Sequence, residues 1–157
     1  MNNNSTKSKN KANGNPYVGV YGVYIKDGKA LLIKKARGPY TGMYDLPGGG
    51  IEEGEANDQT LVREFVEEVG VQLESYDFLY DDKYQCKYIG STGIEKDFKH
   101  QGSFYSVTIP DDANIKTTPD GQDSLGAEYI EIDRIQGGTV TVAPMAKRVI
   151  LTLINKE

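Results

Sequence analysis

The chain has 157 residues, with 23 acidic residues against 18 Lys and Arg, and a net charge of −5. This length fits one compact domain with its own core. The negative charge argues against attachment to nucleic acid through a basic surface, although a nucleotide could still bind together with metal ions. One cysteine, Cys86, excludes an internal disulfide, and no apolar run reaches the roughly 18 residues of a membrane span. We therefore expect a cytoplasmic protein without a membrane partner.

Residues 1–16 consist almost entirely of Asn, Lys, Ser, Thr and Gly. Such a segment has too little apolar surface to fold alone, so it is predicted to be a disordered tail. It also lacks the apolar stretch of a secretory signal. The folded domain is expected to span residues 17–157.

A β-hairpin is predicted directly after the tail. Residues 17–25 alternate small and apolar side chains, residues 26–29 form a turn, and residues 30–36 return as a second strand. A glycine-rich turn follows at residues 46–50. Its glycines permit a close approach of the backbone to a ligand.

Residues 57–70 have the periodicity of an amphipathic helix, with Asn57 as a plausible N-cap and Gly70 as a plausible C-cap. At 100° per residue, Glu67 and Glu68 lie within roughly 60° on either side of Glu64. One adjoining arc is apolar and is formed by Leu61, Val62, Phe65, Val66 and Val69.

The three clustered carboxylates have two interpretations. Like charges one turn apart destabilise a helix by a few tenths of a kcal/mol per pair, and a solvated acidic face is the simpler explanation. The alternative is a site for a hard divalent cation, whose preferred ligands are carboxylate oxygens. The glycine-rich turn directly before the helix favours the metal site, because it brings backbone to the same place.

The remainder of the chain predicts more strands and a closing helix. Strands are expected at residues 71–80, 84–89, 102–109 and 127–132, separated by loops at 90–97 and 110–124. Residues 144–156 carry apolar side chains at helical spacing behind Pro144. The pattern indicates an α/β protein with a mixed β-sheet between helices.

The spacing of residues around this helix resembles the Nudix box of MutT-like hydrolases. Gly49 is followed after five residues by Glu55, and after seven more by Arg63-Glu64, an apolar residue, Glu67-Glu68, Gly70 and Val71. A chance match is on the order of 10⁻⁷ for seven fixed positions. Residues 17–47 are similar to the strand and loop that lead into the box, with Tyr44 where many members have Trp. The resemblance implies the α/β/α Nudix sandwich.

The resemblance also implies a hydrolase dependent on Mg²⁺ or Mn²⁺. Such enzymes cleave the diphosphate linkage of a nucleoside diphosphate joined to another group, as in a nucleoside triphosphate, a nucleotide sugar or a dinucleoside polyphosphate, by metal-assisted attack of water. Glu64, Glu67 and Glu68 are the expected metal ligands, together with a backbone carbonyl near Gly48 or Gly49. Glu64 or Glu67 is the candidate for orienting the water.

By the same resemblance, Arg63 pairs with Glu55, and in addition with Glu52, to fix the loop against the helix. The alternative is that Arg63 contacts a phosphate directly, which its donor chemistry permits.

Asp123 is the candidate for a further carboxylate that completes the metal site or acts as a base, as in several Nudix enzymes. Glu128, Glu95 and Asp97 compete for this role. An Asp in this sequence context is equally typical of a turn.

Substrate identity is weakly encoded. Tyr17 and Tyr40 precede the catalytic loop and are candidates for stacking on a base, although most of the eleven tyrosines should be core or strand residues. Cys86 stands where ADP-ribose hydrolases often have Pro, and Tyr88 matches a Tyr favoured by dinucleoside polyphosphate hydrolases. A nucleotide sensor without turnover and an RNA 5′-end pyrophosphohydrolase are the alternative functions, and a homodimer is possible.

Overall fold

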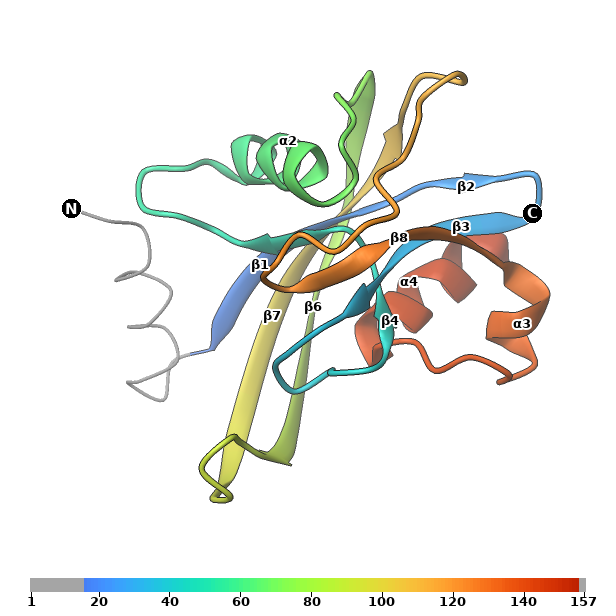
Figure 1. The fold of residues 1–157 in the computed structure, drawn as a ribbon. Helices are drawn as coiled ribbons and strands as arrows, with labels where there is room; N and C mark the ends of the chain where they lie inside the picture. Colours follow the sequence, from blue (N-terminus) through green and yellow to red (C-terminus); the bar gives the residue numbers. More distant parts are fainter. Residues whose placement is uncertain (1–15, 156–157) are drawn as a thin grey trace.

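The computed structural model describes residues 16–155 (Figure 1). The predicted tail therefore lies outside the described residues, apart from Pro16. The elements in chain order are β1 (Tyr17–Val23), β2 (Ile25–Lys26), β3 (Lys29–Lys35), β4 (Tyr44–Asp45), β5 (Gly48–Gly50), α2 (Asn57–Glu68), β6 (Ser75–Ile89), β7 (Glu95–Thr108), β8 (Ser124–Glu131), α3 (Ile132–Gln136) and α4 (Pro144–Ile154).

The strands form two four-stranded sheets. One has the order β5-β1-β7-β6, and the other is built from β2, β3 and β4 with β8 paired to β3. Strands β1 and β7 run parallel, whereas the other named strand pairs are antiparallel. The β-structure is therefore mixed, as predicted.

Hydrophobic side chains fill both faces of this β-structure. Along β3, Leu31 and Ile33 pack with Leu61 and Phe65 of α2, whereas Leu32 packs on the other side with residues of α3 and α4. Alternation of side chains along a strand produces these two cores, and a strand covered on both faces is apolar throughout. Figure 1 shows α2 on one side of the sheets and α4 on the other. This is the predicted α/β/α sandwich.

The ends of α2 differ by one residue from the prediction. The cap before Asn57 is Ala56, whose backbone N–H is bound by the side chain of Gln59 at 2.8 Å. At the other end Val69 is the C-cap, and Gly70 follows it with φ +76°. Glycine adopts this left-handed conformation without steric cost, so the helix ends here.

Two predictions about the later elements are wrong. Strand β6 is continuous where two strands were expected, because the polar residues of its middle, 81–83, pair with residues 101–103 of β7. Strand β7 begins at Glu95, inside the expected loop at 90–97. The five-residue helix α3 was not predicted, since it is too short for a periodic pattern.

The hairpin expected between residues 17–25 and 30–36 is present only as the short pairing of β2 with β3. Strand β3 pairs with the short β2 and with β8, while β1 joins the other sheet. Within residues 16–155, no helix is both long and apolar enough to cross a membrane.

Candidate active site

The glycine-rich turn lies directly against α2. Strand β5 pairs with β1, and the backbone N–H of Gly48 donates to Oε1 of Glu68 at 2.9 Å. A Cβ atom at Gly49 would lie 2.7 to 2.9 Å from the carboxylate atoms of Glu64, and one at Gly48 would collide with the carbonyl of Val20. Only glycines allow this close approach of backbone to the helix carboxylates.

Two of the three helix carboxylates are buried. Glu64 is 6% exposed and Glu68 is 3% exposed, whereas the side chain of Glu67 is half exposed. Burial, followed by the negative charge of Glu64, raises the pKa of Glu68 well above its usual range. Two adjacent buried carboxylates are unfavourable unless a cation compensates them.

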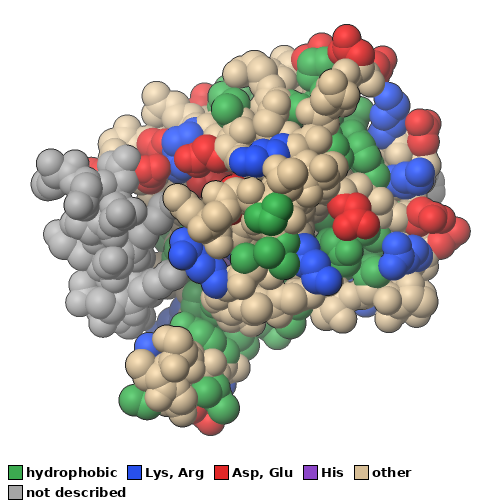
Figure 2. Space-filling view, viewed as in Figure 1, with side chains coloured by type: hydrophobic (Ala, Val, Ile, Leu, Met, Phe, Trp, Pro, Cys, Tyr) green, Lys and Arg blue, Asp and Glu red, His purple; other side chains and the backbone are tan. Residues whose placement is uncertain are grey.

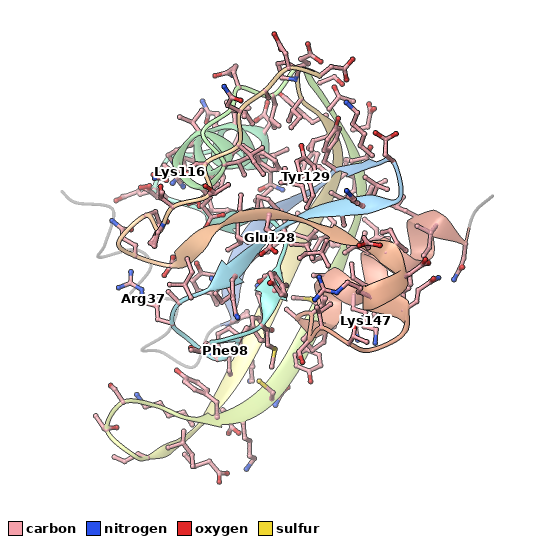
Figure 3. All side chains as sticks on the ribbon, turned by 45° about the vertical axis from the view of Figure 1, so that its right-hand side comes forward. Arg37, Phe98, Lys116, Glu128, Tyr129 and Lys147 are labelled. Atoms are coloured by element: carbon pink, nitrogen blue, oxygen red, sulfur yellow. The ribbon has the colours of Figure 1, made fainter. Side chains whose placement is uncertain are left out.

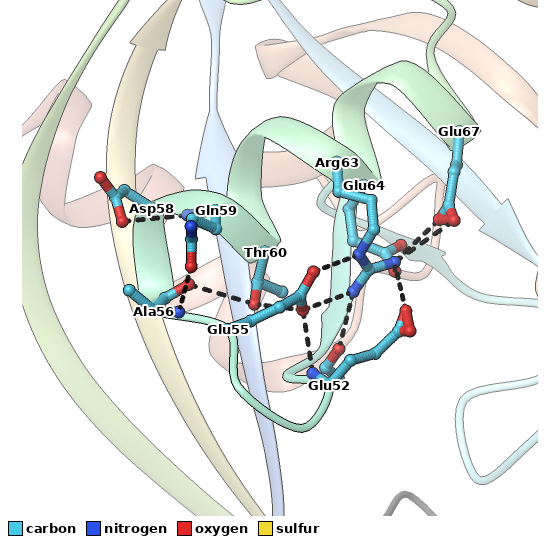
Figure 4. Close-up of polar contacts among 10 residues, drawn as sticks. Glu52, Glu55, Ala56, Asp58, Gln59, Thr60, Arg63, Glu64 and Glu67 are labelled. Atoms are coloured by element: carbon cyan, nitrogen blue, oxygen red, sulfur yellow. Dashed lines mark hydrogen bonds and ion pairs between the residues drawn. The ribbon is translucent and has the colours of Figure 1, made fainter. Parts of the chain in front are cut away.

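Arg63 braces the glycine-rich turn and its following loop against the helix (Figure 4). Its Nε donates to Oε2 of Glu55 at 2.6 Å, and its Nη2 donates to the carbonyl of Gly50 at 3.2 Å. The hydrogen bonds from Arg63 are the main reason why the pKa of Glu55 falls to about 2. Glu52 lies 3.3 Å from Arg63 Nη1. The predicted contacts of Arg63 with Glu55 and Glu52 are therefore present.

The same guanidinium also contacts the candidate metal ligands. Arg63 Nη1 donates to Oε1 of Glu64 at 2.8 Å and to Oε2 of Glu67 at 2.9 Å. These bonds hold both carboxylates on one side of the helix. Since Arg63 itself is shared among several carboxylates, its contact with a phosphate would require some of these bonds to open.

Among residues 16–155, no three His, Cys, Asp or Glu side chains are already gathered as metal ligands. Glu64 and Glu67 are hydrogen-bonded to Arg63, whereas Glu68 is hydrogen-bonded to the backbone N–H of Gly48. The donor set nevertheless fits Mg²⁺ or Mn²⁺, because it consists of carboxylates, two of them buried, beside a glycine cradle. An ionised carboxylate has about four acceptor positions, so a contact with Arg63 is compatible with a cation.

A cavity of about 640 Å³ opens over these carboxylates. One wall is the acidic side of α2, and the other is the loop before β8. Lys116 lies beside α2, and Arg37 lies beneath this loop (Figure 3). The cavity is lined by Glu52, Arg63, Glu64, Val66, Glu67, Glu68, Lys116, Asp120, Gln122 and Asp123.

The structure brings Asp123 to this cavity. Arg37 Nε donates to its Oδ1 at 2.7 Å. The turn-forming role belongs to Asp120 instead, whose Oδ1 accepts the backbone N–H groups of Gln122 and Ser124 at 2.7 and 3.0 Å.

The competitors of Asp123 do not line the cavity. Glu128 accepts a hydrogen bond from Tyr44 at 3.1 Å. Glu95 and Asp97 lie at 3.5 and 3.7 Å from Lys87 in the β6–β7 hairpin.

The two candidate base-stacking tyrosines have different positions. Burial raises the pKa of Tyr17, and the charges of Asp123 and Glu64 raise it further, so Tyr17 lies within electrostatic reach of the acidic cavity. Tyr40 is buried, and its hydroxyl is hydrogen-bonded to Nδ1 of His100 at 2.9 Å. Tyr40 does not line the cavity, because it belongs to the core.

Sequence reasoning missed Lys116, Asp120 and Gln122. They lie in the predicted loop at 110–124, where only the polar composition was a signal. A larger hollow, of about 900 Å³, lies at the far ends of β7 and α4 and contains none of the box residues.

A model of the NUDIX domain family matches residues 15–149, and the chain belongs to this family. Among curated proteins it is similar to an ADP-ribose pyrophosphatase of Methanocaldococcus jannaschii, with 46% identity over 56 residues, which are 36% of this chain and 33% of that protein. It is also similar to the nucleoside triphosphatase NudI of Escherichia coli, with 49% identity over 49 residues, 30% of this chain and 35% of the other. The chain thus matches about a third of the length of these relatives.

Solved structures agree on the fold. A MutT NUDIX hydrolase from Burkholderia pseudomallei has 25% identity and a TM-score of 0.60, covering 87% of this chain and 96% of that one. The NUDIX domain of Shewanella oneidensis NrtR, solved with ADP ribose, has a TM-score of 0.66 over 99% of both chains. Its identity of 16% supports a common fold and nothing more specific.

Proposed function

We propose that this protein is a Mg²⁺- or Mn²⁺-dependent pyrophosphohydrolase that cleaves the diphosphate linkage of a nucleoside diphosphate joined to another group. The observation that carries the proposal is the pair of buried carboxylates, Glu64 and Glu68, held against a glycine cradle beneath an open cavity. Burying two adjacent negative charges is otherwise unfavourable, and it prepares a site for a hard cation.

Each side chain has a task in the proposed reaction. Glu64, Glu67 and Glu68 bind the cation, with backbone of Gly48 or Gly49 beside them. When bound, a divalent cation neutralises charge on the phosphates and makes water a better nucleophile at neutral pH. Glu67 is the half-exposed member of the trio, so it is placed to orient the attacking water and accept its proton.

Arg63 and Glu55 act as positioning residues. Their bidentate pair, at 2.6 and 3.0 Å, fixes the loop against α2 and keeps the carboxylates in place. The second wall of the cavity carries Lys116, whose ammonium group neutralises negative charge on the phosphates. The same wall carries Asp123, whose carboxylate acts as a further metal ligand or as a base. Tyr17 is the candidate for contact with the base.

The names of the relatives suggest where to look for the substrate. One is an ADP-ribose pyrophosphatase and another is a nucleoside triphosphatase. Both activities break a diphosphate linkage, and both fit the proposed chemistry. Cys86 stands at a position where ADP-ribose hydrolases often have Pro. It therefore favours a nucleoside triphosphate over ADP-ribose as the substrate.

The test is a panel of nucleoside triphosphates, ADP-ribose, nucleotide sugars, dinucleoside polyphosphates and 5′-triphosphorylated RNA, assayed with and without Mg²⁺. We expect metal-dependent release of a nucleoside monophosphate from at least one small molecule. Turnover of RNA alone would support the RNA-end alternative. Tight nucleotide binding with no turnover under any condition would overturn the proposal in favour of a sensor.

A further inference from the structure

Strand β6 forms a long free edge. Fourteen of its fifteen residues pair with β7 on one side, and among the described residues no strand lies on the other side. The second half of β6 and the first half of β7 project from the body as an arm, whose end stands clear of the rest of the molecule (Figures 1 and 2). An edge of this length exposes unpaired backbone groups that can bind another strand.

The backbone direction along this edge can be read from one contact. The carbonyl of Lys83 accepts a hydrogen bond from Arg148 Nη2 at 3.1 Å, so it points away from β7. Backbone groups alternate in direction along an antiparallel strand, so Asp81, Gln85 and Lys87 present theirs on the same outer side. A carbonyl has two acceptor positions, and the bond to Arg148 occupies one at Lys83.

We propose that this edge binds the same edge of a second copy of the chain, with the two strands antiparallel and a two-fold axis at Tyr84. In this register Asp81 lies opposite Lys87 of the second copy, and Lys83 lies opposite Gln85 of the second copy. The opposite-charge pair of Asp81 and Lys87 occurs twice, once on either side of the axis. Cross-strand pairs of this kind stabilise a sheet, and backbone pairing of the outward residues within 80–88 supplies about eight hydrogen bonds.

The pattern of charges selects this register. Moving the axis by one residue, to Lys83, places the two copies of Lys83 opposite each other. Moving it the other way, to Gln85, places Lys83 opposite Lys87. Like charges directly opposite one another are destabilising. With the axis at Tyr84, no like charges face each other along residues 80–88.

The ends of the paired segment are consistent with the same arrangement. A β-bulge between Phe78 and Tyr80 ends the regular edge on the body side. On the arm side the strand ends at Ile89, whose side chain is 70% exposed. The bulge and Ile89 thus bound the regular segment, residues 80–88, that is available for pairing with the second copy.

Sedimentation equilibrium of the full chain tests this dimer through a charge exchange. Asp81→Lys and Lys87→Asp should each weaken dimerisation by at least about tenfold, because each sets like charges opposite one another. The double variant, which carries both changes, restores the attraction and should bring the dissociation constant back to near the original value. Within its own copy Lys87 pairs with Glu95 and Asp97, and Asp81 accepts a hydrogen bond from Ser103. The double variant lacks these contacts as the single variants do, so only pairing between two copies explains such a rescue.

Lys99→Asp is the matched control. Lys99 is an exposed lysine of the same arm, but it lies on β7 opposite Gln85, away from the free edge. This variant should dimerise like the unmodified protein. Gln85→Pro removes an outward N–H without touching the β7 pairing, and it should give folded monomer. A monomeric unmodified protein at about 100 µM, or a dimer that the two single charge changes leave intact, would overturn the proposal.

Discussion

Arg63 Nε donates to Glu55 Oε2 at 2.6 Å, while the same guanidinium reaches Glu64 at 2.8 Å. One side chain therefore links the loop after the glycine-rich turn to a buried carboxylate of the proposed metal site. Arg63 and Glu55 together hold this loop and the Glu64 carboxylate in fixed positions.

Arg63→Lys should lower kcat by about 10- to 100-fold with a smaller change in KM, because an ammonium cannot span Glu55 and the helix carboxylates together. It should also cost about 1 to 3 kcal/mol in the free energy of unfolding. Steady-state kinetics and urea unfolding measure both effects. Arg134→Lys, on α3, is the control. A change in KM alone would favour direct contact of Arg63 with phosphate.

Gly49→Ala should weaken Mn²⁺ binding by about 10- to 100-fold, because the new methyl group would occupy the space of the Glu64 carboxylate. Titration calorimetry measures this without reference to turnover. Gly90→Ala is the control, since the nearest atoms to its Cβ are 3.7 Å away at the end of a lysine. Equal Mn²⁺ affinity of the two variants would show that the glycine cradle has no part in the site.

Asp120 and Asp123 should separate into a structural and a functional residue. Asp120→Ala removes the acceptor of two backbone N–H groups and should cost about 1 kcal/mol of stability. Asp123→Asn should change stability by less than about 1 kcal/mol, because its ion pair with Arg37 is exposed. If Asp123 acts in the cavity, its kcat should fall by at least about tenfold. Unchanged turnover would remove Asp123 from the site.

His100 should make stability depend on pH. Burial, reinforced by the charge of Lys35, lowers its pKa from 6.5 to about 4, and its ring nitrogens are hydrogen-bonded to Tyr21 and Tyr40. Because the unfolded chain binds the proton more readily, the contribution of His100 is complete above pH 6.5. It is lost as the pH falls to about 4, by about 3 kcal/mol.

His100→Gln keeps a donor and an acceptor but does not titrate. The unfolding free energy of the unmodified protein should therefore fall by about 3 kcal/mol relative to that of His100→Gln between pH 7 and pH 4. A difference that stays constant across this range would contradict the assignment of His100 as a buried neutral base.

The sequence predicted those parts of the site that depend on local spacing. Glu64, Glu67 and Glu68 share a helix, so their common side follows from the helical period. Contacts between segments far apart in the chain could not be predicted from local spacing. Tyr40 is buried because His100 lies beside it, sixty residues later in the chain, and Lys116 lines the cavity because its loop folds back over α2.

In the fold, too, elements set by local periodicity were predicted and those set by distant pairing were not. Apolar periodicity was sufficient for α2 and α4, and the resemblance to the Nudix box implied the α/β/α class. Strand β6 was divided in the prediction because Asp81, Asp82 and Lys83 look like a turn. In the structure they pair with residues 101–103 of β7, and pairing rather than composition decides their conformation.

The most direct test of the account is the Mg²⁺ dependence of turnover, measured on the best substrate for the unmodified protein, Glu67→Gln and the exposed control Glu53→Gln. We predict saturable Mg²⁺ dependence for the unmodified protein and for Glu53→Gln. Glu67→Gln should be folded and slower by at least about 100-fold at saturating Mg²⁺. Turnover without a divalent cation, or Glu67→Gln as active as the unmodified protein, would contradict the proposed mechanism.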